Sequence, residues 1–112
     1  MRQKLLIDTT DDMFYRQYVE VVKVFPPINK LNRRELGTLS EIMRKNNELS
    51  KKFKDCPEDE DKWTLLMSRQ IRKEMRERAG LSIASWNNNL NSLRSAGILI
   101  DNKLTESLRV YP

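Results

Sequence analysis

Apolar residues recur every three or four positions along most of this chain, and this spacing predicts helices. In the first stretch they are Phe14, Tyr18, Val21 and Phe25. The spacing predicts a helix to about Val24, closed by Pro26 and Pro27, although the closely spaced valines there also fit a strand. Ahead of it, residues 4–7 fit a short strand and residues 8–12 supply helix-capping side chains.

The second stretch predicts a long helix from about Arg33 into the Lys51-Lys52 region. Asn32 and Glu35 have the spacing of a capping box at its start. Its apolar stripe consists of Leu36, Leu39, Ile42, Met43, Leu49 and Phe53. Residues 55–61 hold five acids and read as a solvated connection, in which Pro57 suits a first helical position. The acids fit a charged loop better than a calcium loop, because the glycine turn and the ligand spacing of a calcium loop are missing.

The third and fourth stretches predict two helices separated by the short break Gly80-Leu81-Ser82. The stripe of the first is Trp63, Leu66, Met67, Ile71, Met75 and Ala79. The second is expected to bury Ile83, Trp86, Leu90 and Leu93. Residues 98–100 and 108–111 then read as two strands around a turn at 101–103. The pattern therefore predicts a mainly α fold with a small β-hairpin.

The residue types that are absent or rare in this chain exclude several classes of function. The chain has 112 residues, no histidine, one cysteine and three glycines. It therefore lacks histidine-dependent catalytic triads, imidazole metal ligands, an internal disulfide and a phosphate-cradling glycine loop. We expect no enzyme activity, metal, cofactor or small-molecule substrate. No apolar run approaches membrane-spanning length and the start does not resemble a signal peptide, so a cytoplasmic protein is expected.

The stretch from Met75 to Leu99 resembles the winged helix-turn-helix family of DNA-binding domains. In that pattern an apolar residue precedes the turn glycine by five positions, as Met75 precedes Gly80. The remaining matches are Leu81-Ser82, then Trp86, Leu90 and Leu93, then Ala96-Gly97-Ile98-Leu99. Arg76 departs from the pattern, because a small residue is usual where the two helices cross. The resemblance implies a winged helix-turn-helix domain at 31–112, with residues 1–30 as a strand and helix extension.

The resemblance places the 82–96 helix in the major groove of DNA. The polar face of that helix supplies the base-contact candidates Ser85, Asn88, Asn89, Asn91 and Ser92. Asparagine can bond the edge of adenine, and serine can bond either partner of a base pair. The phosphate-contact candidates are Arg69, Arg72, Lys73, Arg76 and Lys103. The first four share one helical stripe, and phosphate contacts position a protein without reading sequence. The alternative for the base-contact set is a solvated polar face, and the alternative for the basic stripe is an ordinary charged face with Glu–Arg pairs.

Two function hypotheses follow. The net charge of +5 favours an anionic partner, hence a small protein that binds double-stranded DNA. It would be a transcriptional regulator or a replication accessory factor, of cellular, phage or plasmid origin. However, the excess charge lies mostly in the first half of the chain, and the predicted wing is nearly neutral. The alternative is therefore a protein-binding winged-helix adaptor, or a subunit of a larger assembly that would be virion-associated if viral. A homodimer through residues 1–30 is a further expectation.

Overall fold

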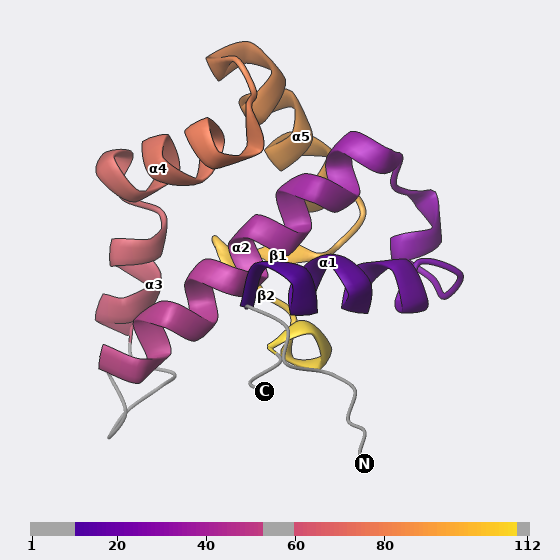
Figure 1. Ribbon diagram of the computed structural model, residues 1–112, viewed down its shortest axis with the longest axis horizontal. Coiled ribbons are helices and arrows are strands. Elements are labelled where there is room, and N and C mark those ends of the chain that lie inside the picture. Colours follow the sequence, from indigo (N-terminus) through magenta and orange to yellow (C-terminus); the bar gives the residue numbers. More distant parts are fainter. Residues whose placement is uncertain (1–10, 53–59, 110–112) are drawn as a thin grey trace.

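The computed structural model describes residues 11–52 and 60–109 (Figure 1). The predictions for residues 4–7, Phe53 and Pro57 lie outside these residues. In chain order the elements are α1 (Asp11–Val22), η2 (Ile28–Lys30), α2 (Arg33–Lys52), α3 (Glu60–Leu66), α4 (Arg69–Ala79), α5 (Ile83–Ser95), β1 (Leu99–Ile100), β2 (Lys103–Leu104) and η3 (Glu106–Leu108). The predicted mainly helical fold with a small antiparallel hairpin is confirmed at this level.

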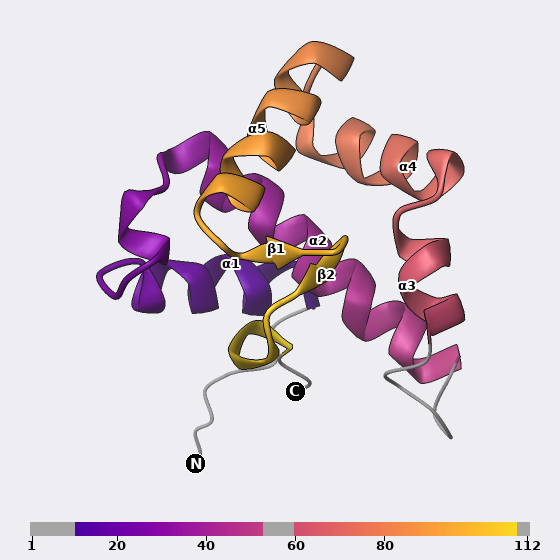
Figure 2. The same ribbon diagram turned by 180° about the vertical axis from the view of Figure 1, so that it is seen from behind.

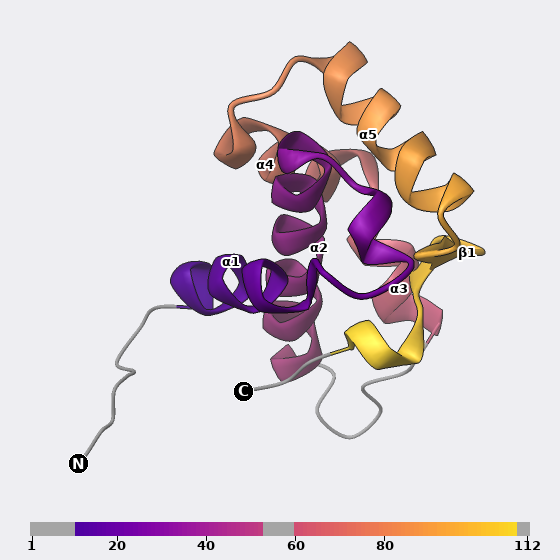
Figure 3. The same cartoon turned by 90° about the vertical axis from the view of Figure 1, so that its right-hand side faces the viewer.

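Helix α2 is the centre of the fold, and α1, α3, α4 and α5 all pack against it (Figures 1 and 3). It begins where the capping pattern predicted. The backbone N–H of Glu35 donates to Asn32 Oδ1 at 2.9 Å, and the backbone N–H of Asn32 donates to Glu35 Oε1 at 2.8 Å. Two N–H groups that a helix start leaves without partners are thus satisfied, which fixes the first turn.

Replacing Asn32 by alanine should lower the free energy of unfolding by about 1 kcal/mol, because the Glu35 N–H loses its acceptor. Urea denaturation followed by circular dichroism measures the change. Asn32→Ser is the matched control, since serine also caps helices and should restore most of the stability. Equal losses for alanine and serine would contradict a capping role.

Helix α1 has the predicted helical form, so the alternative strand reading of its valines is wrong. The residues that it buries differ from the predicted stripe. Tyr15 and Val19 are in the core, whereas Val21 and Phe25 are 69% and 61% exposed. Phe14 meets Tyr15 edge to face, with ring centroids 5.0 Å apart, and stacks on Tyr18, with ring centroids 6.2 Å apart. The face of α1 that packs on the core is therefore rotated relative to the face predicted from the spacing of apolar residues.

The single helix predicted across 63–79 is in fact two helices, α3 and α4, which run in different directions (Figure 1). Ser68 separates them with extended backbone, and its hydroxyl accepts a hydrogen bond from the Ile71 N–H at 3.4 Å. A serine at this position competes with the helical backbone for that donor and starts a new helix. The break lets Trp63 and Leu66 pack at one site of the core and Met75 at another.

The corner between α4 and α5 has the form that the sequence predicted. Gly80 adopts left-handed backbone with φ of 70°, which glycine tolerates without the clash of a side chain. The N–H of Leu81 bonds Arg76 O at 3.1 Å and closes the end of α4. Ser82 then caps α5 by accepting from the Ser85 N–H at 3.1 Å. Two helices thus meet across a three-residue link, residues 80–82.

The hairpin after α5 is shorter than predicted (Figure 2). Leu99 pairs with Leu104, and Ile100 pairs with Lys103. Asp101 and Asn102 both have positive φ, 54° and 61°, and form the two-residue turn that such hairpins favour. The second strand therefore lies at residues 103–104. The strand predicted at 108–111 is wrong for residues 108 and 109, and the rest of it lies outside the described residues. Residue 108 instead ends η3, where its side chain still joins the core.

Candidate nucleic-acid interface

Helices α4 and α5 enclose an open groove of about 800 Å³. Its lining consists of Arg69, Gln70, Arg72, Lys73, Arg76, Ile83, Trp86 and Asn87. Four of these side chains are cationic and none is a carboxylate. Helices α4 and α5 meet at the corner formed by Gly80 (Figure 1), and basic residues of α4 share the groove lining with residues from the first turns of α5. The predicted basic stripe and the predicted recognition helix therefore share one surface.

The cations of this groove are not used in ion pairs within the described part of the chain. Arg69 and Lys73 are exposed, and Arg72 and Arg76 are half-buried. Arg76, which departs from the family pattern, donates from Nη1 to the Leu81 carbonyl at 3.2 Å and braces the corner. An alternative reading was that Glu–Arg pairs neutralise this face. The structure brings no such pair to these four side chains among the residues that it describes.

Glu74 of α4 forms an ion pair with α2 and does not line the groove. Glu74 accepts from Lys45 Nζ at 3.3 Å, and on the same side Arg78 Nε donates to Glu41 at 3.1 Å. Lys45 also bonds Glu48 at 2.9 Å. Burial raises the pKa of Glu48, but the hydrogen bonds and charges of Lys45 and Arg44 outweigh it and hold that pKa below its ordinary value. Glu74 and Arg78 of α4 thus pair with α2 outside the groove lining, and the lining itself carries only positive charge.

The outer face of α5 carries four of the five base-contact candidates. Asn88 and Asn91 are exposed, and Asn91 accepts a hydrogen bond from Arg94 at 2.9 Å. Ser85 and Ser92 are half-buried at the edge of this face. Ser92 donates to the Asn88 carbonyl at 3.2 Å, so its hydroxyl is partly engaged by its own helix.

Asn89 is a correction to the predicted base-contact set. It is only 8% exposed, and its amide nitrogen donates to Thr38 Oγ1 on α2 at 2.9 Å. Asn89 follows Trp86 by three positions and precedes Leu93 by four, so it lies on the buried side of α5. Its amide joins α5 to α2, and it is unavailable to a ligand on the outer face.

Asn89→Ala should destabilise the fold by about 1–3 kcal/mol, because Thr38 is fully buried and loses its partner. Thermal unfolding measures this loss. Asn88→Ala is the matched control on the exposed face and should change stability by less than about 0.5 kcal/mol. If the two variants were equally stable, the bond between α5 and α2 would be of no consequence.

Four residues of the groove were missed by sequence reasoning, namely Gln70, Ile83, Trp86 and Asn87. Ile83, predicted to be core, is 64% exposed, and Asn87 was not among the base-contact candidates. Both lie on the flank of α5 that faces α4. Their four-residue spacing indicates that Ile83 and Asn87 lie on the same face of the helix. The sequence did not show that this face lies beside α4. Lys103, the remaining phosphate candidate, lies on β2 outside the lining of the groove.

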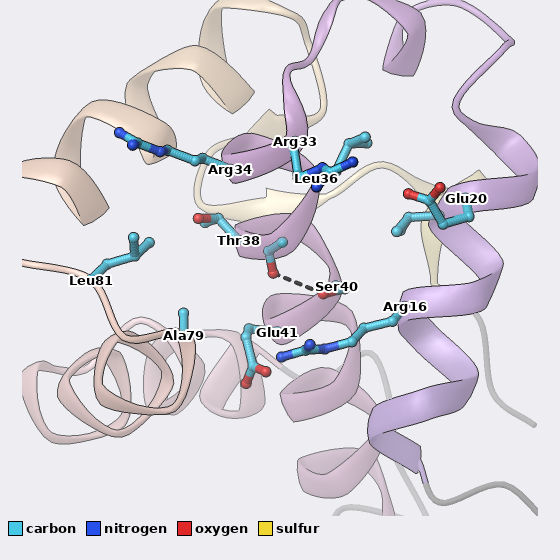
Figure 4. Close-up of a pocket in the computed structure, with 12 residues that line it drawn as sticks. Arg16, Glu20, Arg33, Arg34, Leu36, Thr38, Ser40, Glu41, Ala79 and Leu81 are labelled. Carbon is cyan, nitrogen blue, oxygen red and sulfur yellow. Dashed lines mark hydrogen bonds between the residues drawn. The ribbon is translucent and has the colours of Figure 1, made fainter.

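A second cleft of about 450 Å³ lies between α1, α2 and the corner (Figure 4). It is lined by three arginines and two glutamates, namely Arg16, Arg33, Arg34, Glu20 and Glu41. Figure 4 shows that Arg33 and Arg34 point in different directions and that Arg16 reaches toward Glu41. Mixed charge and diverging guanidinium groups make this cleft a poorer anion site than the groove.

Within residues 11–52 and 60–109, no cluster of three histidine, cysteine or acidic residues is arranged to bind a metal ion. None of the helices described there combines the length and the apolar character needed to cross a membrane. Comparison with protein-family models, curated proteins and solved structures found no match.

Proposed function

We propose that this chain is a small DNA-binding protein whose residues 31–112 form a winged helix-turn-helix domain. In this proposal α2, α4 and α5 are the three helices, α5 enters the major groove, and the β1–β2 hairpin is the wing. The order of helices, the glycine corner and the hairpin that follows α5 support the assignment. We assign it a binding role, as in transcriptional regulation or replication, rather than catalysis.

The observation that carries the proposal is the cationic groove beside a polar helix face. Four cations without ion pairs in the described chain can neutralise phosphates, which positions a protein on a duplex. Exposed Asn88 and Asn91 then offer amide groups that can bond adenine edges. Ser85 and Ser92 border the same face. With about four phosphate contacts from α4, the isolated chain should bind weakly and with a strong dependence on salt.

Fluorescence anisotropy with a labelled mixed-sequence duplex, measured across a series of salt concentrations, tests the proposal. We expect affinity to fall with rising salt, with a slope that corresponds to about three to five neutralised phosphates. Absence of binding at low salt would refute DNA binding by this chain. A salt-independent interaction would equally contradict it, since phosphate contacts release counterions.

A protein-binding winged-helix module is the second candidate, and exposed apolar residues favour it. Val21, Val24 and Phe25 are 69%, 66% and 61% exposed near the end of α1. Such clusters often mark protein interfaces. They lie outside the lining of the α4–α5 groove, so a partner or a second copy could contact them while DNA occupies the groove. Analytical ultracentrifugation, with Phe25→Ser as the variant, would reveal self-association at this cluster.

A further inference from the structure

Two hydrogen-bond donors in the α4–α5 groove are buried without a partner in the described chain. They are the indole Nε1 of Trp86 and the guanidinium Nε of Arg72. Both residues line the groove, one from each helix. Most buried donors in folded proteins are paired, because leaving one unpaired costs free energy. Two unpaired donors beside one groove indicate that a ligand completes them.

The chemistry of the lining limits what that ligand can be. Tryptophan, arginine and lysine side chains offer donors and no acceptors. The lining adds positive charge from Arg69, Lys73 and Arg76, and it contains no carboxylate. The matching group is anionic and carries several acceptor oxygens, and phosphate has both properties.

We propose that this groove binds a phosphate group, with Trp86 Nε1–H and Arg72 Nε–H donating to its oxygens. The choice of a DNA backbone phosphate as the source rests on the proposed function, and a free phosphate ion shares the same chemistry. Both donor atoms are covered in the unliganded chain. Binding therefore requires side chains of the groove to move and uncover both donors.

The indole has a role that differs from that of the cations. Trp86 is neutral, so its hydrogen bond adds affinity without releasing a counterion. Trp86→Phe should weaken DNA binding about three- to tenfold at every salt concentration and leave the salt slope unchanged. Arg72→Lys keeps the charge but loses the planar donor group, and should likewise weaken binding with little change in slope. Trp86 thus acts both as a core residue and as a binding residue.

The decisive titration is carried out on the wild-type chain, and a variant serves only to assign its signals. The sequence contains two tryptophans, so a ¹⁵N–¹H spectrum has two indole signals, which a Trp63→Phe variant assigns. The protein is titrated with a DNA duplex, with inorganic phosphate, and with sodium chloride at matched ionic strength. Trp63 is the internal control, because it lies in the core and outside the groove lining.

A downfield shift of the Trp86 indole proton with duplex, absent with chloride, supports a backbone phosphate in the groove. A saturable shift with inorganic phosphate supports the same site with a free ion, even if anisotropy shows no DNA binding and the proposed function fails. If the duplex binds but the Trp86 signal does not move, the inference is overturned while DNA binding stands. If neither the duplex nor phosphate moves it, the inference is overturned as well.

Discussion

Replacing Arg69 and Arg72 together by glutamine should reduce the salt slope of DNA binding by about two and lower the affinity roughly ten- to a hundredfold at low salt. Both side chains line the α4–α5 groove, and neither has an ion pair in the described chain, so their loss removes phosphate contacts without breaking a bridge. Because glutamine keeps helix propensity and a polar surface, the fold should be unaffected. Anisotropy across a salt series measures both quantities.

The matched control removes two charges elsewhere. Lys51 and Lys52 are exposed in the last turn of α2, outside the lining of the groove. Replacing both by glutamine lowers the net charge equally and should leave the slope nearly unchanged. If the two double variants lost affinity alike, binding would depend on total charge, and the groove would have no special role.

Leu90→Ala should lower the free energy of unfolding by about 2–5 kcal/mol, the second large effect that we expect. Leu90 is 1% exposed and lies on the face of α5 that packs on α2. Removing three carbons there leaves a cavity that the helix can close only in part. Such a loss is a large fraction of the stability of a small domain. Urea denaturation at equilibrium measures it.

Ile83→Ala on the same helix is the comparison variant. The periodicity of the sequence placed both residues on the buried stripe, but Ile83 is 64% exposed. Its replacement should change the stability by less than about 0.5 kcal/mol. A loss as large as that of Leu90→Ala would mean that Ile83 is buried in solution. The two variants together therefore test whether Leu90 is in the core and whether Ile83 is exposed.

The sequence predicted most element boundaries because local chemistry set them. Asn32 with Glu35 marked the start of α2, Gly80 marked the end of α4, and Ser82 marked the start of α5. Each signal consists of a side chain or a backbone preference that acts within one helical turn. Such signals require no knowledge of what packs nearby.

The errors arose where tertiary contacts decided the outcome. Ser68 lies inside an apolar repeat that continues from α3 into α4, so spacing alone could not reveal the break. Ile83 was expected to be buried and is exposed, whereas Asn89 was expected to be exposed and is buried, and both errors have one cause. The buried face of α5 is set by where α2 lies, and this turns the face toward Asn89 and away from Ile83. The structure therefore removes Asn89 from the candidate site, and the remaining candidates stay predictions.

The charges of this molecule fall into two sets that respond differently to dissolved ions. Each pair between α2 and α4 joins a side chain that solvent hardly reaches to one that is exposed, with Glu41 at 4% against Arg78 at 41% and Lys45 at 5% against Glu74 at 46%. Mobile ions screen such half-covered pairs only in part, whereas they compete directly for the cations of the open groove. If the chain binds DNA as proposed, added salt should weaken that binding more than it weakens the contact of α4 with α2. Ionic strength would then control release from a duplex before it affects the fold.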